Sequence, residues 1–246
     1  MTLDRLRSAP DARALALRAE AAVAPLELER HRIDGAIMEA TCASPGYYFG
    51  NRFILDRAPT AETLDGWIAR YRECFAWRSV EYPAVLTWFE PDGESVNAGT
   101  FETEVETLFV APGDGEILPS SLKGCRIIVF SNARHWQQLV ELECAAYQSG
   151  EAFTQWRASA FRALMDGESG AYYHEGVARF AGVITKEERR GCGLATHLIT
   201  DLLLRMRRRA HTVVIAAHTR SNAASLYARI GFTPFLYSHS LVIHLT

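Results

Sequence analysis

The stretch Arg190-Gly191-Cys192-Gly193-Leu194-Ala195 decides how the C-terminal half of this chain is interpreted. An apolar run, Val183-Ile184-Thr185, precedes it, and a segment with helical periodicity follows it from about Leu194 to Arg209. Apolar runs on both sides of a glycine-containing turn are typical of a strand, a tight connection and a helix. We therefore expect a strand, a turn and a helix in this order.

A turn of this composition is suited to binding an anion. The first N–H groups of a helix have no partner within the helix, and they lie at its positive end. Gly191 and Gly193 lack the Cβ atoms that would hold a phosphate away from the backbone, and Arg190 adds a cation. The pattern also fits a turn that only joins a strand to a helix, so both interpretations stay open.

A second pattern lies downstream and makes the first more specific. An apolar run from Thr212 to Ala217 predicts a strand, and it is followed by Asn222-Ala223-Ala224-Ser225-Leu226-Tyr227-Ala228-Arg229-Ile230-Gly231-Phe232. Together the two segments resemble the GCN5-related N-acetyltransferase (GNAT) family. In that family, Arg/Gln-x-x-Gly-x-Gly/Ala holds the pyrophosphate of acetyl-CoA, and the matching residues here are Arg190, Gly191, Gly193 and Ala195. The family's second pattern is met at Asn222, Tyr227, Gly231 and Phe232.

The resemblance covers about residues 125 to 246 and implies a fold and a domain arrangement. The implied fold class is α/β (α+β), with a GNAT-type mixed, mostly antiparallel sheet flanked by helices. We expect a GNAT N-acetyltransferase domain at residues 125–246 and an N-terminal α/β lobe at residues 1–115. The lobe has a strand, helix, strand order without the glycine turn, so we interpret it as a degenerate GNAT-like lobe that does not bind CoA in the same way.

The resemblance also implies roles for individual residues. It implies that Tyr227 is the catalytic general acid for the departing thiolate, because a phenol with a pKa of about 10 stays protonated at neutral pH. Tyr227 can also be interpreted as an aromatic residue that fills the core. Asn222 can also be interpreted as the residue that caps the helix. The resemblance implies that acetyl-CoA, as co-substrate, is held by a strand that splays from its neighbour, by the turn and by two helix starts: Val183, Ile184, Thr185, Arg190, Gly191, Cys192, Gly193, Leu194, Ala195, Thr196 and Asn222.

Apolar periodicity and turn residues predict the remaining elements. We expect helices at about 10–24, 60–76, 132–147 and 152–165, and strands within 26–42 and at 47–55, 83–90, 100–111, 125–130, 171–175 and 177–185. In the family, two antiparallel strands precede the strand that leads to the glycine turn. In this sequence, only the single expected strand at 171–175 occupies that position. The sheet edge is therefore expected to be shortened or completed by the N-terminal half.

Composition excludes several classes of protein. The net charge of −3 argues against a nucleic-acid partner, and no apolar run reaches the 18 or so residues of a membrane span. The five cysteines form no C-x-x-C pair, which favours free thiols in the cytoplasm. The eight histidines show no metal-ligand spacing, so we expect no metal.

The expected activity is direct transfer of an acetyl group from acetyl-CoA to an amine, and the acceptor is a small molecule rather than a protein. Glu102, Glu104 and Glu106 alternate along one strand face, which fits either a solvated face or a face that binds a cationic acceptor. The aromatic stretch 47–53 fits a core strand or a wall of the substrate site. No general base stands out; the candidates, each more readily structural, are Glu141, Glu143, His174, Glu175 and His218. A non-catalytic acyl-CoA-binding protein is the alternative.

Overall fold

A computed structural model gives the structure of the protein. It describes residues 9–24, 28–42, 45, 47–79, 82–93, 101–111, 122, 127, 132–147, 171–180 and 183–244. The helices are α1 (Ala9–Val23), α2 (Ala61–Cys74), α3 (Ala133–Tyr147), α5 (Leu194–Met206) and α6 (Asn222–Ile230), with short 3-10 helices η2 (Tyr48–Gly50) and η3 (Glu187–Arg189). The strands are β1 (Glu29–Ile33), β2 (Ala36–Ala40), β3 (Arg52–Leu55), β4 (Ala84–Glu90), β5 (Glu102–Val110), β6 (Ala171–His174), β7 (Val177–Phe180), β8 (Thr212–His218) and β9 (Thr233–Ile243).

The described strands form one nine-stranded sheet in the order β1-β2-β3-β4-β9-β5-β8-β7-β6. Two neighbouring pairs are parallel, β3 with β4 and β7 with β8, and the others are antiparallel. Each parallel pair is joined by one helix, α2 or α5, because parallel strands need a crossover connection. The predicted fold class, a mixed and mostly antiparallel sheet flanked by helices, is confirmed.

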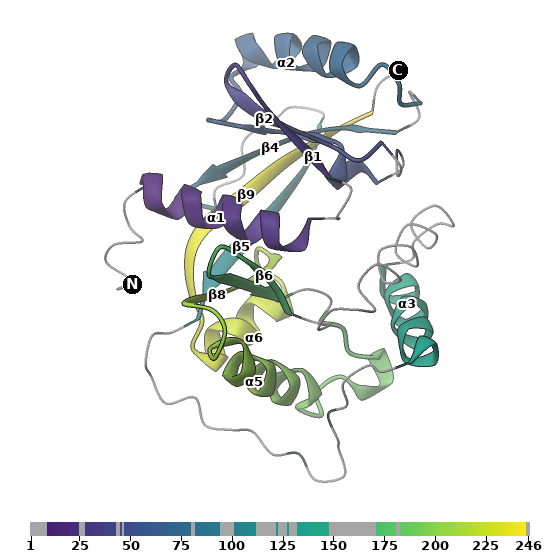
Figure 1. Cartoon of the computed structure of the whole chain (residues 1–246), viewed down its shortest axis with the longest axis vertical. Helices are drawn as coiled ribbons and strands as arrows, with labels where there is room; N and C mark the ends of the chain where they lie inside the picture. Colours follow the sequence, from purple (N-terminus) through teal and green to yellow (C-terminus); the bar gives the residue numbers. More distant parts are fainter. Residues whose placement is uncertain are drawn as a thin grey trace.

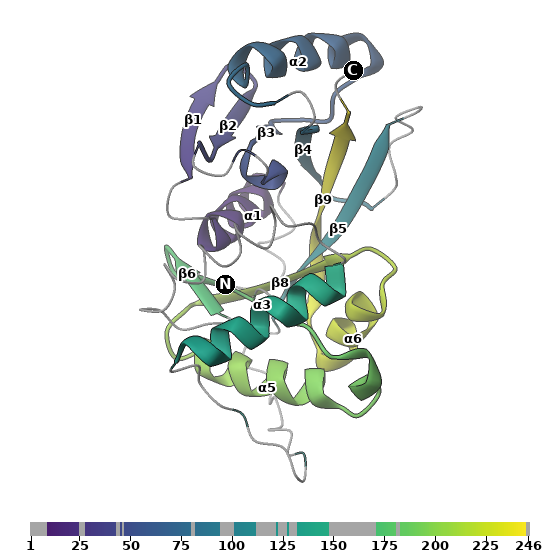
Figure 2. The same cartoon turned by 90° about the vertical axis from the view of Figure 1, so that its right-hand side faces the viewer.

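The two halves of the chain exchange strands at the centre of the sheet (Figure 1, Figure 2). The N-terminal half contributes β5, which pairs with β8 of the C-terminal half. The C-terminal half contributes β9, which pairs with β4 of the N-terminal half, and β9 and β5 also pair with each other. The boundaries at residues 115 and 125 stay a prediction, but the sheet itself is shared by both halves.

Helices cover both faces of this sheet. Neighbouring residues of a strand point to opposite faces, so Phe53 and Ile54 of β3 show which helices lie on which side. Phe53 packs under α2, with its ring 5.6 Å from that of Tyr71, whereas Ile54 packs with Ala12 and Ala16 of α1. The same division recurs in β8, where alternate residues pack against α1 and against the helix pair α5 and α6. Helix α1 therefore lies on one face, and α2 and the α5–α6 pair lie on the other.

A buried ion cluster ties α1 to both halves of the chain. The carboxylate of Glu20 on α1 accepts hydrogen bonds from Arg52 of β3, at 2.8 Å, and from Arg179 of β7. Arg52 also donates to Glu39 of β2 at 2.8 Å. Burial opposes ionisation of Glu20, but the two guanidiniums outweigh it and lower the pKa of Glu20 to about 2.

One predicted strand is shorter than expected. The apolar run from Val177 to Thr185 was expected to be continuous, but the strand ends at Phe180, and residues 183–186 have no regular structure. The prediction that Val183-Ile184-Thr185 lie in a strand is therefore wrong, because apolar side chains also suit an irregular segment that packs on a core. The predicted helix at 152–165 lies outside the described residues, as does the predicted strand at 125–130 apart from residue 127. Within the described part of the chain, no helix combines the length and the apolarity that crossing a membrane requires.

Candidate functional site: a glycine turn at the start of α5

The glycine turn has the backbone conformation that its sequence predicts. Gly191 and Gly193 have φ values of 77° and 79°, in the left-handed region that residues with a Cβ atom avoid. A Cβ atom at Gly191 would meet nothing within 4 Å, and one at Gly193 would lie 3.7 Å from Leu122 Cδ1. Backbone conformation, rather than lack of space, therefore requires glycine at both positions.

The turn presents a run of N–H groups that no other part of the described chain uses. The carbonyl of Gly193 accepts the first helical bond of α5, from the N–H of His197 at 3.0 Å. The six preceding N–H groups, from Gly191 to Thr196, have no hydrogen-bond partner among the described residues, and Gly193 provides no side-chain cap. Residues 186–193 are exposed. These N–H groups can donate hydrogen bonds to an anionic ligand, so the residues present fit a pyrophosphate.

The other described helix starts that follow strands are closed by their own side chains. The Thr60 hydroxyl accepts a hydrogen bond from the N–H of Thr63 at the start of α2, and the Thr63 hydroxyl accepts one from the N–H of Thr60 at 2.9 Å. Helix α2 occupies, in the β3–α2–β4 unit, the place that α5 has in β7–α5–β8. The N-terminal unit thus has the connectivity without the open turn, as a degenerate lobe would.

Strand β7 pairs with only the first part of β8. Their parallel ladder joins Val177, Ala178 and Arg179 to Thr212, Val213 and Val214. Strand β8 continues to His218, and beyond Val214 it has no ladder partner on the β7 side among the described residues. Residues 183–185 are half-buried and follow β7 on the way to the glycine turn. The predicted binding residues Val183, Ile184 and Thr185 therefore lie outside the ladder, whose last pair is Arg179 with Val214.

Arg190 precedes the two glycines of the turn and Cys192 lies between them, and both residues are exposed. The Arg190 guanidinium is 62% exposed and lies 3.9 Å from the carboxylate of Glu187. An exposed pair at this distance is weak, so Arg190 can turn toward another anion. Cys192 is exposed, and its thiol is free, as are the thiols of the exposed Cys42 and the half-buried Cys74.

Tyr227 lies in the core beneath α6. Its residue is 5% exposed, and its ring meets the ring of Phe109 edge to face, with the centroids 5.9 Å apart. The ring of Tyr227 therefore packs in the core, as the alternative interpretation expects. A catalytic role for the hydroxyl group stays a prediction, since a buried ring and a reactive phenol are compatible.

The second sequence pattern is explained largely by how α6 begins and ends. Ser221, and not Asn222, is the N-cap, with its hydroxyl accepting from the N–H of Ala224 at 3.1 Å. The interpretation of Asn222 as the capping residue is wrong, and Asn222 is an exposed first residue of the helix. At the other end, Gly231 has φ 103°, and the N–H of Phe232 donates to the carbonyl of Tyr227 at 3.0 Å.

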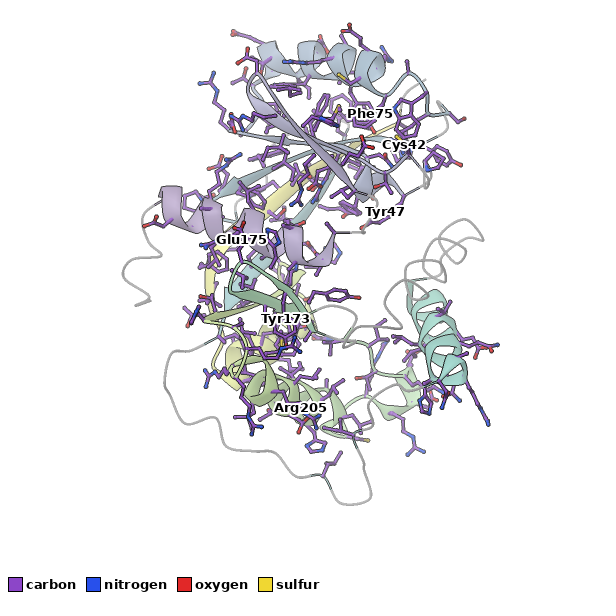
Figure 3. All side chains as sticks on the ribbon, in the orientation of Figure 1. Cys42, Tyr47, Phe75, Tyr173, Glu175 and Arg205 are labelled. Atoms are coloured by element: carbon purple, nitrogen blue, oxygen red, sulfur yellow. The ribbon has the colours of Figure 1, made fainter. Side chains whose placement is uncertain are left out.

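The basic run at the end of α5 makes local contacts. Arg205 pairs with Asp201 on the same helix at 2.7 Å, and Figure 3 shows Arg205 on the side of α5 away from the sheet. The guanidinium of Arg209 lies 4.5 Å from the ring centroid of Tyr173 on β6. These contacts favour a structural role for both arginines.

Two further sets of candidate residues are separated by the fold. Phe53 of the aromatic stretch is fully buried under α2, with its ring centroid 5.5 Å from that of Phe75, so it belongs to the core and not to the wall of a substrate site. Figure 3 labels Phe75 beneath α2. The acidic strand β5, in contrast, lies beside the end of β8, where Glu106 stands opposite His218. Burial is the main cause that raises the pKa of Glu104, and His218 opposes it. The sequence could not indicate this pairing, because 112 residues separate the two positions.

The described residues contain no group of three or more His, Cys, Asp or Glu side chains placed to hold a metal ion. His174 and Glu175, at the β6–β7 turn, are exposed, with 3.8 Å between His174 Nε2 and the carboxylate of Glu175. Glu141 lies on α3 and accepts from Gln137 on the same helix at 3.0 Å. None of these three candidate bases lies on the strands beside the glycine turn.

Comparisons with known proteins agree with this geometry. Residues 170–239 match the model of the family described as FR47-like protein. A functionally unknown conserved protein from Staphylococcus epidermidis is similar in structure, with a TM-score of 0.71, 13% identity, and coverage of 90% of this chain and 96% of that one. A GCN5-related N-acetyltransferase from Kribbella flavida has a TM-score of 0.61 and 16% identity, covering 94% and 95% of the two chains.

A tandem GNAT protein from the clavulanic acid biosynthesis pathway is also similar, with a TM-score of 0.52, 15% identity, and coverage of 98% of this chain and 92% of that one. No curated protein sequence matches the chain. At these identities the likeness is one of fold. The chain therefore has the GNAT fold, and the resemblance to the GNAT family is confirmed. The match to a tandem GNAT protein extends that fold over the N-terminal half.

Proposed function

We propose that this protein is an acyltransferase that moves an acetyl group from acetyl-CoA directly to the amine of a small molecule. The observation that carries the proposal is the row of six N–H groups, from Gly191 to Thr196, without a partner among the described residues. It follows the end of the β7–β8 ladder along the chain. Structures of this fold that are described as acetyltransferases support the same chemistry.

Each part of the site has a task in this proposal. Arg190 and the N–H groups of the turn hold the pyrophosphate, and residues 183–185 offer backbone groups to the pantetheine arm. Acetyl-CoA supplies the activated acetyl group. Holding the two reactants together provides much of the rate, because a bimolecular step becomes effectively unimolecular.

The transfer requires one bond exchange and one proton movement. The acceptor nitrogen, as a neutral amine, forms a bond to the acetyl carbonyl carbon, and the bond from that carbon to sulfur breaks. The nitrogen gives up one proton and the departing thiolate gains one, so the products are the acetylated amine and free CoA thiol. We assign the donation of that proton to the phenol of Tyr227. We also propose a cytoplasmic location, which the unpaired cysteines support.

Calorimetric titration with acetyl-CoA, alongside NAD and ATP, tests the proposal. We expect saturable binding of acetyl-CoA alone, and release of CoA thiol when amines are then added. Failure of acetyl-CoA to bind would overturn the function. Binding without turnover over a broad amine panel would favour the alternative, a non-catalytic acyl-CoA-binding protein.

A further inference from the structure

Three arginines of the described residues are buried, and one of them has no carboxylate partner there. Arg52 and Arg179 are paired with Glu20, and Arg52 also with Glu39. Arg78 is 7% exposed, and none of the ion pairs within the described part of the chain includes it. A guanidinium stays charged at neutral pH, and a buried charge without a counter-ion is costly. Arg78 therefore differs from the other two buried arginines.

Most of the hydrogen-bond donors of Arg78 join three segments of the N-terminal half. Its Nε donates to the carbonyl of Pro45 at 2.9 Å, and its Nη1 donates to the hydroxyl of Tyr71 and, at 3.5 Å, to the carbonyl of Pro83. Nη2, in contrast, is buried and has no hydrogen-bond partner among the described residues. Burial lowers the pKa of Arg78, and its contact with the Tyr71 hydroxyl opposes this shift. Nη2 thus keeps two N–H groups for an acceptor that the described chain does not provide.

Three aromatic rings surround this guanidinium. The Cζ atom of Arg78 lies 5.5 Å from the ring centroid of Tyr82 and 6.0 Å from the centroids of Tyr71 and Phe75. The rings attract the cation, but they are neutral and cannot balance its charge. They also exclude water, and a hydrogen bond between charged groups is stronger where water is excluded. An anion at Nη2 would therefore be held more firmly than one on the exposed surface.

An exposed indole ring lies next to this cluster. Trp77 is 45% exposed, and it is the one large hydrophobic residue that is exposed in the described part of the chain. Its ring contacts that of Phe75, with the centroids 6.2 Å apart, and Phe75 in turn contacts the guanidinium of Arg78. Ala76 and Ser79 are exposed as well. The aromatic cluster around Arg78 therefore continues to the surface through Trp77.

We propose that Arg78 and Trp77 bind a small monocarboxylate that has an apolar or aromatic body. The carboxylate accepts hydrogen bonds from Nη2, and the apolar body packs against the indole ring. One carboxylate balances one guanidinium, whereas a phosphate group carries a charge of about −1.5 to −2 that this single arginine does not balance. Nη2 is shielded from solvent, so the carboxylate enters as the exposed residues beside Arg78 move aside. The site belongs to the β3–α2–β4 unit and does not depend on the proposed acetyl transfer.

Calorimetric titration of the full chain with phenylacetate and with phenylacetamide tests the site, because the two molecules share a ring and differ in the negative charge. We expect phenylacetate to bind about tenfold or more tightly than phenylacetamide, since only the carboxylate balances the buried cation. Acetate, which has the charge without the ring, should bind more weakly than phenylacetate. Equal affinities of phenylacetate and phenylacetamide, or no binding of phenylacetate, would overturn the proposal.

Substitutions assign the two parts of the ligand to the two residues. Arg78→Gln should abolish the preference for phenylacetate over phenylacetamide. Arg70→Gln is the matched control, because Arg70 also lies over a ring, 5.6 Å from the centroid of Trp67, and donates to a backbone carbonyl, but is only half-buried. Trp77→Ala, a change at the surface, should lower the affinity for phenylacetate to that for acetate.

Urea unfolding midpoints show whether each variant folds. If Arg78→Gln does not fold, the comparison of the two ligands in the wild type and the exposed Trp77→Ala variant decide the outcome. An unchanged preference in a folded Arg78→Gln variant would contradict the role of the guanidinium. An unchanged affinity for phenylacetate in Trp77→Ala would contradict the role of the indole ring, and either result would overturn the site as proposed.

Discussion

Two glycines determine the geometry of the turn, and each acts through its backbone. Both Gly191 and Gly193 have positive φ, which costs a residue with a Cβ atom about 1–2 kcal/mol. Their neighbours leave room for a methyl group, so a substitution there changes the conformation of the turn and not the packing. This distinguishes them from core positions, where added volume is the problem.

Gly193→Ala should weaken acetyl-CoA binding by about tenfold, because relief of the strain at φ 79° turns the N–H groups away from their common direction. Calorimetric titration measures the change. Gly66→Ala is the matched control, since Gly66 is exposed within α2 and alanine there should raise stability by up to about 1 kcal/mol. Unchanged affinity of the Gly193 variant would remove the turn from the binding site.

Tyr227→Phe should lower kcat by about a hundredfold while the Kd of acetyl-CoA stays nearly constant, because the ring keeps its contact with Phe109 and only the proton donor is lost. Steady-state kinetics and calorimetry separate the two effects. Tyr237→Phe, on β9, is the control for loss of a phenol elsewhere. Wild-type turnover in the Tyr227 variant would leave the residue with its core role alone.

At the scale of elements, α1 is held in place by charge as well as by packing. Its alanines and Leu15 lie on the sheet, and Glu20 joins it to β3 and β7. The arginines that Glu20 binds come from opposite halves of the chain. Loss of this carboxylate leaves Arg52 and Arg179 buried with less compensation, and uncompensated buried charge is costly.

Glu20→Gln should therefore reduce the free energy of unfolding by about 3–5 kcal/mol, measured by urea denaturation at pH 7. Glu29→Gln, whose carboxylate is 66% exposed, is the control and should change it by less than about 0.5 kcal/mol. A decrease of similar size in both variants would contradict a special role for the buried cluster.

The same variant predicts how stability depends on pH. The pKa of Glu20 is about 2 in the folded protein and 4.5 as its ordinary value, so its ionised form favours folding by about 3 kcal/mol above pH 4.5. This contribution is lost as the pH falls from 4.5 toward 2. The difference in unfolding free energy between wild type and Glu20→Gln should therefore shrink over that range. If the difference in unfolding free energy stayed constant over this pH range, the destabilisation by Glu20→Gln would come from a change in side-chain packing and not from the loss of charge.

At the scale of the whole molecule, strand exchange makes the two halves depend on each other. Strand β5 fills the position between β8 and β9, and β9 completes the sheet beside β4. A chain cut between the halves would leave unpaired strand edges on both pieces. The sheet thus joins two lobes that the sequence suggests are separate.

Residues 125–246 expressed alone should accordingly show no cooperative urea transition, because the partners of β8 and β9 are missing. Coexpression with residues 1–124 should yield a complex that copurifies and unfolds cooperatively. Circular dichroism during urea titration measures both. If the C-terminal fragment unfolds cooperatively with the midpoint of the whole chain, the exchanged strands contribute little to its stability.

The residue patterns predicted those features of the structure that depend on residues close together in the sequence. Positive φ at two glycines, the helix that follows them and the strand, helix, strand order of both halves could all be predicted, because turn residues and apolar periodicity act over a few positions. Even locally there were errors. Asn222 was expected to cap α6, but Ser221, one position earlier, satisfies the same donor. The apolar run after β7 was expected to be strand because apolarity alone cannot distinguish paired from unpaired backbone.

The sequence by itself determined the open turn at the start of α5 and its likeness to an acetyl-CoA site, since both follow from residue types at short spacing. Only the tertiary structure decided that β5 lies between β8 and β9, that Phe53 is buried in the core, and that Glu106 stands beside His218. Pairing between strands a hundred residues apart is set by the burial of whole faces and by hydrogen bonding along whole edges. No local pattern encodes such pairing, because each strand can satisfy its own periodicity beside several different partners.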